Sequence, residues 1–228
     1  MPDLRNAQGE PTGAIYGVIN MLRRLRIDYK TEYLACVFDA KGKTFRDDAY
    51  PEYKANRSVP PEDLGIQITN SKAIIDILGI SQVEKSGFEA DDVIGTLSCM
   101  ATRAGVKTIV STGDKDLTQL VNQGVTLVNT MSNEVLDEAG VAQKFGVPPA
   151  LIVDYLSLIG DTVDNVPGVH KVGPKTAVKW LTQYGSLDAV MAHADEISGA
   201  VGENLRQALD WLPKGRHLLT VNLTQQPT

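Results

Sequence analysis

Short acidic clusters in this sequence could hold hard divalent cations. The densest lies in "GFEADDVIG", residues 87–95, where three carboxylates fall within four residues before an apolar stretch. Like charges at this spacing repel one another, so a positive group must compensate them. The candidate carboxylates are Asp39, Glu89, Asp91, Asp92, Asp114, Asp116, Asp161 and Asp164. No Cys/His spacing typical of zinc accompanies them, and oxygen ligands alone favour Mg²⁺ or Mn²⁺. Two such ions about 4 Å apart can activate water and stabilise the leaving oxygen in phosphodiester cleavage.

Each acidic cluster also has an ordinary structural explanation. Ser86 and Glu89 match an S-x-x-E capping box, and Asp116 could cap the apolar run that follows it. Asp161 and Asp164 could be turn residues before "NVPG". A capping box accounts for Glu89 alone and does not require the two aspartates that follow. The structural explanations therefore weaken when the clusters are taken together.

The elements that must position these acids alternate between strand and helix in the first part of the chain. Apolar runs predict strands over residues 33–40, 106–111 and 125–130, with a short hairpin partner over 132–136. Helical spacing predicts helices over 66–78 and 89–105, and a further helix beginning at 117. Because the carboxyl ends of parallel strands meet at one edge of a sheet, we expect Asp39 and Asp114 to converge there.

Strand signals vanish from about Ala139, and helical signals dominate the remainder. We therefore expect an α/β domain over residues 1–140, with a mostly parallel central sheet flanked by helices. A helical lobe over residues 141–228 should pack against it. Nothing between the two lobes resembles a flexible linker, so two packed lobes are expected.

Net charge is −6, which taken alone argues against a nucleic-acid partner. Setting aside the eight candidate carboxylates changes this charge to +2, and the basic side chains are segregated along the chain. We find no apolar run of about 18 residues and no secretory signal, so a cytoplasmic location without a membrane span is expected. Both cysteines, Cys36 and Cys99, lie in apolar stretches, where reduced thiols are expected over a disulfide.

Two basic segments suit a phosphate backbone. "GVHKVGPKTA", residues 168–177, is a tight glycine turn entering a helix, whose free amides favour a phosphate. It lacks the G-K-[ST] ending of a Walker loop, and the alternative is a helical hairpin with solvated lysines. "TFRDDAYPEYKANR", residues 44–57, interleaves cations and aromatics, which suits a single strand. The alternative there is an amphipathic helix whose aromatics face the core.

Five stretches together resemble the 5′-nuclease domain of bacterial DNA polymerase I, the flap endonuclease family. They are "GEPTGAIYG", "VFDAKGKTFRDDAYPEYKANR", "EADDVIGTL", "STGDKDLTQLV" and "GDTVDNVPGVHKVGPKTA", in consistent order from about Gly9 to at least Ser186. The resemblance implies a PIN-like 5′-nuclease fold with a helix–hairpin–helix lobe. It also implies a monomeric, Mg²⁺-dependent 5′-3′ exonuclease and flap endonuclease that acts on 5′ flaps, nicked duplexes and RNA primers during replication and repair. A polymerase would follow as a further domain or act as a separate partner.

The same resemblance assigns roles to individual residues. It implies that the eight carboxylates surround two Mg²⁺ ions, for which Mn²⁺ can substitute. Lys54 resembles the lysine that steadies the scissile phosphate, and we expect Arg46 to assist it. The resemblance places a helical arch at about residues 41–64, where Tyr53 and Arg57 would contact a 5′ single strand. It places the helix–hairpin–helix at about 160–185, with a K⁺ on its carbonyls. The residues expected to contact duplex DNA there are Gly168, Lys171, Gly173, Lys175 and Thr176.

One part of the family pattern is missing. Family members begin with an apolar strand that ends in Asp-Gly, supplies a metal carboxylate and occupies the middle of the sheet. This sequence has no such strand before the first matching stretch. We therefore keep a second hypothesis, a catalytically impaired DNA-binding protein on the same scaffold. A single-strand ribonuclease is a third hypothesis, which the helix–hairpin–helix disfavours.

Overall fold

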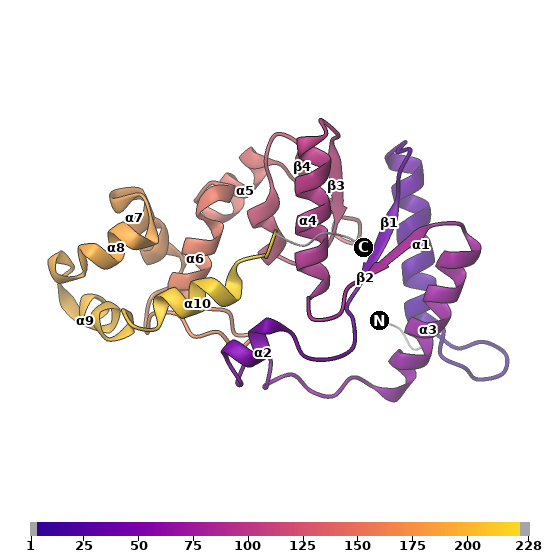
Figure 1. Ribbon diagram of the computed structural model, residues 1–228, viewed down its shortest axis with the longest axis horizontal. Helices are drawn as coiled ribbons and strands as arrows, with labels where there is room; N and C mark the ends of the chain where they lie inside the picture. The colour runs from indigo at the N-terminus through magenta and orange to yellow at the C-terminus, as the bar shows by residue number, and fades with distance from the viewer. Residues whose placement is uncertain (1–3, 224–228) are drawn as a thin grey trace.

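The computed structural model describes residues 4–223 and places the elements in an elongated arrangement (Figure 1). One end is built from α1 (Gly13–Asp28), β1 (Ala35–Phe38), α3 (Glu62–Ile77) and β2 (Ser81–Glu84). β1 and β2 are parallel, with Val37 opposite Val83. A small core of Leu22, Ile75 and Ile80 lies between the two helices and β1. The short helix α2 (Phe45–Ala49) precedes the long connection to α3.

A second, three-stranded sheet forms the middle of the molecule. β3 (Thr108–Ser111) pairs in parallel with β4 (Val125–Asn129), which pairs antiparallel with β5 (Glu134–Leu136). α4 (Ala90–Arg103) contacts both sheets, and the 3₁₀ helix η1 (Asp116–Leu120) follows β3. Val125, Leu127 and Val128 of β4 are buried, so both faces of this strand contribute to the core.

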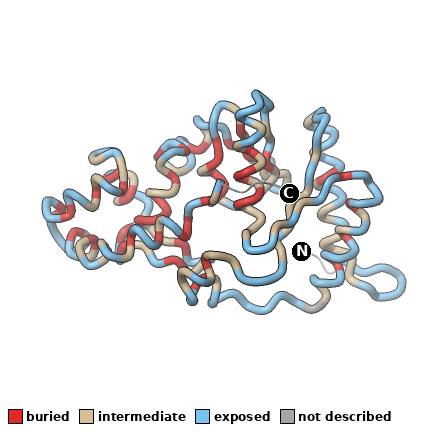
Figure 2. The backbone as a smooth tube through the Cα atoms, viewed as in Figure 1, coloured by how far each residue is buried: buried red, intermediate tan, exposed pale blue. Residues whose placement is uncertain are grey.

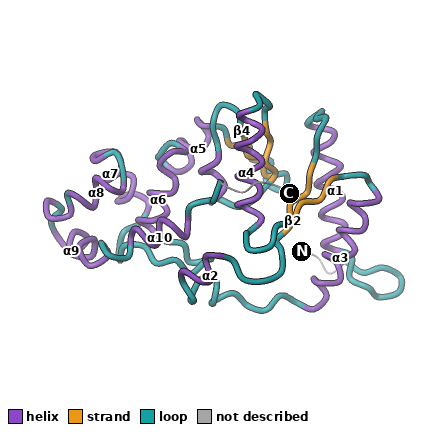
Figure 3. The backbone as a smooth tube through the Cα atoms, in the orientation of Figure 1, coloured by secondary structure: helices purple, strands orange, loops and turns teal. Residues whose placement is uncertain are grey.

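The rest of the described chain is helical (Figure 3). The helices are α5 (Glu138–Phe145), η2 (Pro149–Leu151), α6 (Ile152–Ile159), α7 (Pro174–Tyr184), α8 (Leu187–Ala192), η3 (Ala194–Glu196), α9 (Gly199–Ala208) and α10 (Leu212–Leu219). The large hydrophobic core runs through these helices and into the second sheet, whereas the α1–α3 end is mostly exposed (Figure 2). One continuous core therefore joins the helical part to β3, β4 and η1.

The hairpin between α6 and α7 depends on two glycines. Gly160 ends α6 with a φ of 78°, in the left-handed region that favours glycine. A Cβ atom on Gly168 would lie 2.3 Å from the Gly160 nitrogen and 2.3 Å from the Ile159 carbonyl carbon, so the two backbone segments touch. The Val169 N–H donates to the Leu158 carbonyl at 2.8 Å and closes the hairpin. This α6–hairpin–α7 unit is the helix–hairpin–helix expected from the sequence.

The α/β class with a helical lobe is confirmed, and several local predictions need correction. The strands lie in two sheets, and neither α1 nor β2 was predicted. The helix predicted from residue 66 begins at Glu62, and residues 50–61 of the expected arch are not helical. Glu89 itself is the N-cap of α4, in place of Ser86. The helix expected after 117 is the 3₁₀ helix η1.

Two further expectations concern the whole chain. Cys36 and Cys99 are both free thiols, and burial raises the pKa of Cys36. Within residues 4–223, no helix has the length and apolar character needed to cross a bilayer.

Candidate nuclease site

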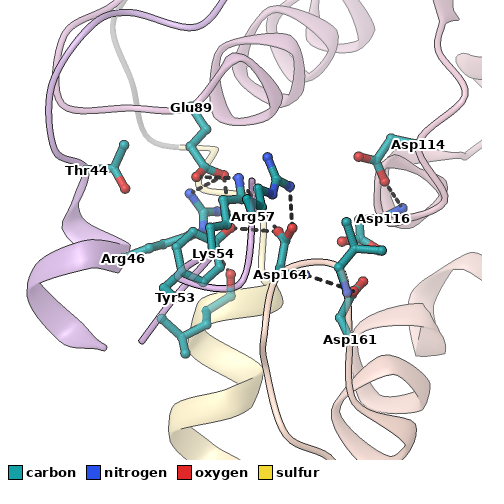
Figure 4. A network of polar contacts seen from close by, with 12 residues as sticks. Thr44, Arg46, Tyr53, Lys54, Arg57, Glu89, Asp114, Asp116, Asp161 and Asp164 are labelled. Carbon is teal, nitrogen blue, oxygen red and sulfur yellow. Dashed lines mark hydrogen bonds and ion pairs between the residues drawn. The ribbon is translucent and has the colours of Figure 1, made fainter. Parts of the chain in front are cut away.

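Three segments that are distant in the sequence meet around Lys54 (Figure 4). The Lys54 Nζ atom donates to Glu89 Oε1 at 2.7 Å and lies 3.7 Å from Asp164 Oδ2. The Tyr53 hydroxyl oxygen lies 3.1 Å from Glu89 Oε2 and 2.9 Å from Asp164 Oδ2. Arg57 forms an ion pair with the other oxygen of Asp164. The connection after α2, the start of α4 and the hairpin after α6 thus share one charged network.

Backbone contacts fix the connection after α2 against the hairpin. The backbone of Lys54 is left-handed, with a φ of 54°, and its N–H donates to the Asp164 carbonyl at 3.0 Å. Two asparagine amides add side-chain bonds: Asn165 to the Glu52 carbonyl and Asn56 to the Thr162 carbonyl, each at 2.7 Å. A lysine in this conformation is strained, and such strain persists only where surrounding contacts hold it. These bonds therefore set the position of the Lys54 ammonium group.

A second cluster of carboxylates surrounds Lys115. Its ammonium group binds both Asp116, at 2.9 Å, and the buried Asp161. Asp161 also accepts the N–H groups of Val163 and Asp164, as a turn residue does. Burial alone would raise the pKa of Asp161, but Lys115 and these amides lower it overall. Burial raises the pKa of Asp116 to about 6, against the opposing effect of Lys115.

A third group contains Asp39, Asp91 and Asp114. Asp39 follows β1 and accepts the Ala90 N–H at 2.7 Å, while Asp114 follows β3 and accepts the Asp116 N–H at 2.9 Å. Burial and the charges of Asp114, Glu89 and Asp39 together raise the pKa of Asp91 to about 7, against the opposing effect of Lys54. Within residues 4–223, no Lys or Arg side chain forms an ion pair with Asp39, Asp91 or Asp114. Negative charge therefore accumulates here without a direct cation.

The donor set fits a hard divalent cation by its chemistry. The acids that crowd Asp91 offer oxygen atoms only, and a cation beside them would relieve their mutual repulsion. In the described conformation of residues 4–223, no three Asp, Glu, His or Cys side chains are arranged to hold one metal ion. Lys54 and Lys115 occupy part of the carboxylate oxygens. Cationic side chains thus supply much of the compensation that the sequence suggested would come from metal.

The roles predicted for Arg46 and Asp92 must be revised. The Arg46 guanidinium binds both oxygens of Asp92, at 2.7 and 2.9 Å, and the carbonyls of Leu218 and Thr220 at 2.8 and 3.0 Å. Arg46 is 3% exposed and Asp92 is fully buried, with a further N–H bond from Asn222. Neither can reach a phosphate or an ion without breaking this pair. In this structure both residues belong to a buried ion pair.

The residues predicted to contact DNA fall into two kinds, one buried and the others accessible to solvent. Tyr53 is buried, so it cannot stack on a base, and its hydroxyl instead bridges two carboxylates. Arg57 is exposed and paired with Asp164. Lys171 and Lys175 are exposed beside the start of α7, where Gly173 is the N-cap, with the half-buried Thr176 in the first turn and Gly168 inside the hairpin. Contact of these hairpin residues with DNA stays a prediction, and their exposure is compatible with it.

Sequence reasoning missed Lys115, the partner of Asp161. The signal was present in "GDKD", because a lysine between two site acids is placed to neutralise them. It also missed Gln119, whose amide binds the chain after α10 at Leu219 and Val221. No local pattern identifies that contact, because its partner lies about a hundred residues further along the sequence.

An α/β domain with acids after its strands, joined to a glycine-dependent helix–hairpin–helix, defines the 5′-nuclease class of fold. The chain belongs to the 5′-3′ exonuclease family. The family model for the 5′-3′ exonuclease N-terminal resolvase-like domain matches residues 1–146, and the model for its C-terminal SAM fold matches residues 147–226.

Curated relatives are 40–50% identical to this chain over the aligned residues. DNA polymerase I of Pseudomonas aeruginosa is 50% identical over 198 residues, which is 86% of this chain and 22% of that protein. The 5′-3′ exonuclease of Aquifex aeolicus is 44% identical over 191 residues, which is 84% of this chain and 66% of that protein. The chain thus spans about a fifth of the polymerase relatives and 66% of the exonuclease.

Solved structures share the fold. T5 5′-exonuclease, in a structure with bound zinc ions, superposes with a TM-score of 0.79 at 17% identity, covering 91% of this chain and 81% of that one. The catalytic core of Rad2 in complex with a DNA substrate superposes with a TM-score of 0.60 at 14% identity, covering 94% and 74%.

Proposed function

We propose that this chain is a structure-specific 5′-3′ nuclease that hydrolyses DNA phosphodiesters at 5′ flaps and nicks. The observation that carries the proposal is the meeting of Lys54, Glu89 and Asp164 from three distant segments. Family membership supports the reaction class, and the relatives are named as DNA polymerase I and 5′-3′ exonuclease. Action on RNA primers in replication and repair, beside a polymerase, belongs to the same proposal and rests on the sequence resemblance. The cytoplasmic location and the monomeric state belong to this proposal.

Divalent ions are part of the proposal. The residues that would hold them are Asp39, Glu89, Asp91, Asp114, Asp116, Asp161 and Asp164, with Asp92 left out because Arg46 occupies it. When bound, Mg²⁺ or Mn²⁺ would activate water and stabilise the leaving oxygen. The zinc-bound T5 structure supports divalent metal as a class. A K⁺ on the hairpin carbonyls remains a prediction from the resemblance alone.

The chain's own residues would bind and orient the substrate. The Lys54 side chain is 26% exposed and its ammonium group is held by Glu89, so it can contact the scissile phosphate while it stays beside Glu89. Exposed Lys171 and Lys175, with the first amides of α7, would bind the duplex backbone. Arg57 would exchange its partner Asp164 for a phosphate of the single strand. These contacts place the phosphodiester beside the acids.

A cleavage assay on a labelled 5′-flap duplex tests the proposal. The parent should release the flap with Mg²⁺ or Mn²⁺ and leave it intact with EDTA. Asp114→Asn should lower the rate by about 100-fold, because it removes a charge from the crowded acids. Asp195→Asn, the same change on an exposed residue of the helical lobe, is the matched control and should cleave normally.

Two outcomes would contradict this function. Salt-dependent flap binding without product at any Mg²⁺ or Mn²⁺ concentration would favour the inactive DNA-binding protein. Full activity of Asp114→Asn would show that the acids after β3 do not serve the reaction.

A further inference from the structure

The end of α10 and the residues that follow it return to the α/β part. We call residues 218–223 the 218–223 segment: the first two are the last residues of α10, and the other four have no regular secondary structure. Leu218, Leu219 and Val221 are buried, at 2%, 5% and 5% exposure. A Cβ atom on Gly95 of α4 would lie 2.5 Å from Val221 Cγ1 and 2.8 Å from Leu223 Cδ2. The segment therefore lies directly on α4, at a point where only glycine leaves room for it.

Side chains from three elements hold the backbone of this segment. Arg46 of α2 donates to the Leu218 and Thr220 carbonyls at 2.8 and 3.0 Å. Gln119 of η1 binds two backbone groups of the segment. Its amide donates to the Leu219 carbonyl at 3.0 Å and accepts the Val221 N–H at 2.9 Å. Asp92 of α4 accepts the Asn222 N–H at 2.8 Å.

Two of these side chains also contact the candidate site. The Arg46 Nη1 atom lies 3.6 Å from Glu89 Oε2, and Asp92 accepts the Glu89 N–H at 3.2 Å. The donors of Arg46 are shared between the segment and Asp92. If the segment left, the guanidinium would lose two of its acceptors and could shift, and its Nη1 atom already lies near Glu89. Arg46 would then turn toward Glu89 and neutralise a carboxylate that the site needs.

We propose that the 218–223 segment is a positioning element for the nuclease site, acting through Arg46. By accepting two bonds from Arg46, the segment keeps that guanidinium on Asp92 and leaves Glu89 to Lys54 and to a divalent ion. Arg46 and Asp92 are thus positioning residues, and neither touches substrate. The inference rests on the proposed function, since it assumes that Glu89 serves a metal-dependent reaction.

Gln119→Ala tests the inference without touching Arg46, Asp92 or Glu89. It removes two bonds to the segment, so Mn²⁺ should bind about fivefold more weakly, measured by electron paramagnetic resonance on the protein without DNA. Single-turnover flap cleavage should slow by a similar factor, while flap affinity in Ca²⁺ stays unchanged. Gly95→Ala, which displaces Val221, should have the same effect. Gln207→Ala, on the exposed side of α9, is the matched control and should change neither value.

A double-variant cycle separates this mechanism from general loosening of the fold. In an Arg46→Lys background, Gln119→Ala should cost nothing further, because the side chain through which it acts is already displaced. If the double variant loses Mn²⁺ affinity by the product of the two single-variant losses, the proposal is overturned. Normal Mn²⁺ affinity in both Gln119→Ala and Gly95→Ala would also overturn it.

The two proposals can fail separately. If the parent binds Mn²⁺ and does not cleave, the proposed function fails while the Mn²⁺ titrations still decide the role of the segment. If the parent neither binds Mn²⁺ nor cleaves, both proposals are wrong.

Discussion

Replacing Gly168 by alanine tests whether the hairpin needs direct backbone contact. The new Cβ atom would lie 2.3 Å from both the Gly160 nitrogen and the Ile159 carbonyl carbon, and 2.7 Å from the Ile159 oxygen. All three are backbone atoms at the end of α6, so no side-chain rotation relieves the overlap. Overpacking of this kind costs about 3 kcal/mol. For a domain of this size, that loss lowers the melting temperature by roughly 6–12 °C.

Gly173→Ala is the control for this prediction. It makes the same change in the same hairpin, at a position with nothing within 4 Å of the added atom. Loss of the glycine N-cap should cost at most about 1 kcal/mol. Melting is followed by circular dichroism, and salt-dependent binding of a flap duplex by fluorescence anisotropy. Gly168→Ala should lower the melting temperature and weaken flap binding, because the proposed function assigns the exposed lysines of the hairpin to DNA. Equal melting temperatures for the two variants would refute the close packing of Gly160 on Gly168.

Three further predictions follow from the charged groups. Arg46→Met leaves Asp92 buried without its partner, so the free energy of unfolding, measured in urea, should fall by about 3–5 kcal/mol. A loss under about 1 kcal/mol would contradict the buried pair. Lys54→Ala should slow single-turnover cleavage about 100-fold with little change in flap affinity, and a loss confined to affinity would contradict a role at the scissile phosphate. The pKa of Asp91 is raised from 3.8 to about 7 and that of Asp116 to about 6, so the folded state binds more protons than the unfolded chain between these values. Metal-free protein should therefore melt at progressively lower temperature as pH rises from 4 to 7. A melting temperature that rises over that range would show that these acids ionise freely.

Much of this architecture is readable from the sequence, because local patterns determine it. The apolar strand β1, the acidic start of α4 and the glycine hairpin after α6 each have a signature within about ten residues. β1 is half-buried where a buried strand was predicted, because Ala35 is exposed and the next three residues are partly exposed. β2 escaped prediction because "SQVE" holds a single apolar residue, and its place is set by pairing with β1. α1 was missed although apolar residues lie at helical spacing in its sequence, at Ile15, Val18, Leu22 and Leu25.

The site was harder to predict than the elements that carry it. The strand ends predicted that the carboxylates would lie near one another. They did not predict which cationic side chains neutralise the charge of those carboxylates. Arg46 reaches Asp92, and Lys115 reaches Asp161, across 46 positions in each case. Such pairs form only when the whole domain is folded. Interleaved cations and aromatics suggested a surface for a single strand, whereas Tyr53 is buried by its contacts with two carboxylates.

The bond from Arg46 to the Leu218 carbonyl joins residues 172 positions apart. A contact of such sequence separation forms late, because the intervening chain must be ordered first. During synthesis, residue 218 leaves the ribosome long after the arch and α4 have emerged. A growing polypeptide would therefore hold Arg46 and Asp92 without their partners in the 218–223 segment. Under the proposed function, DNA cleavage would begin only after this segment has been synthesised and has folded onto α4.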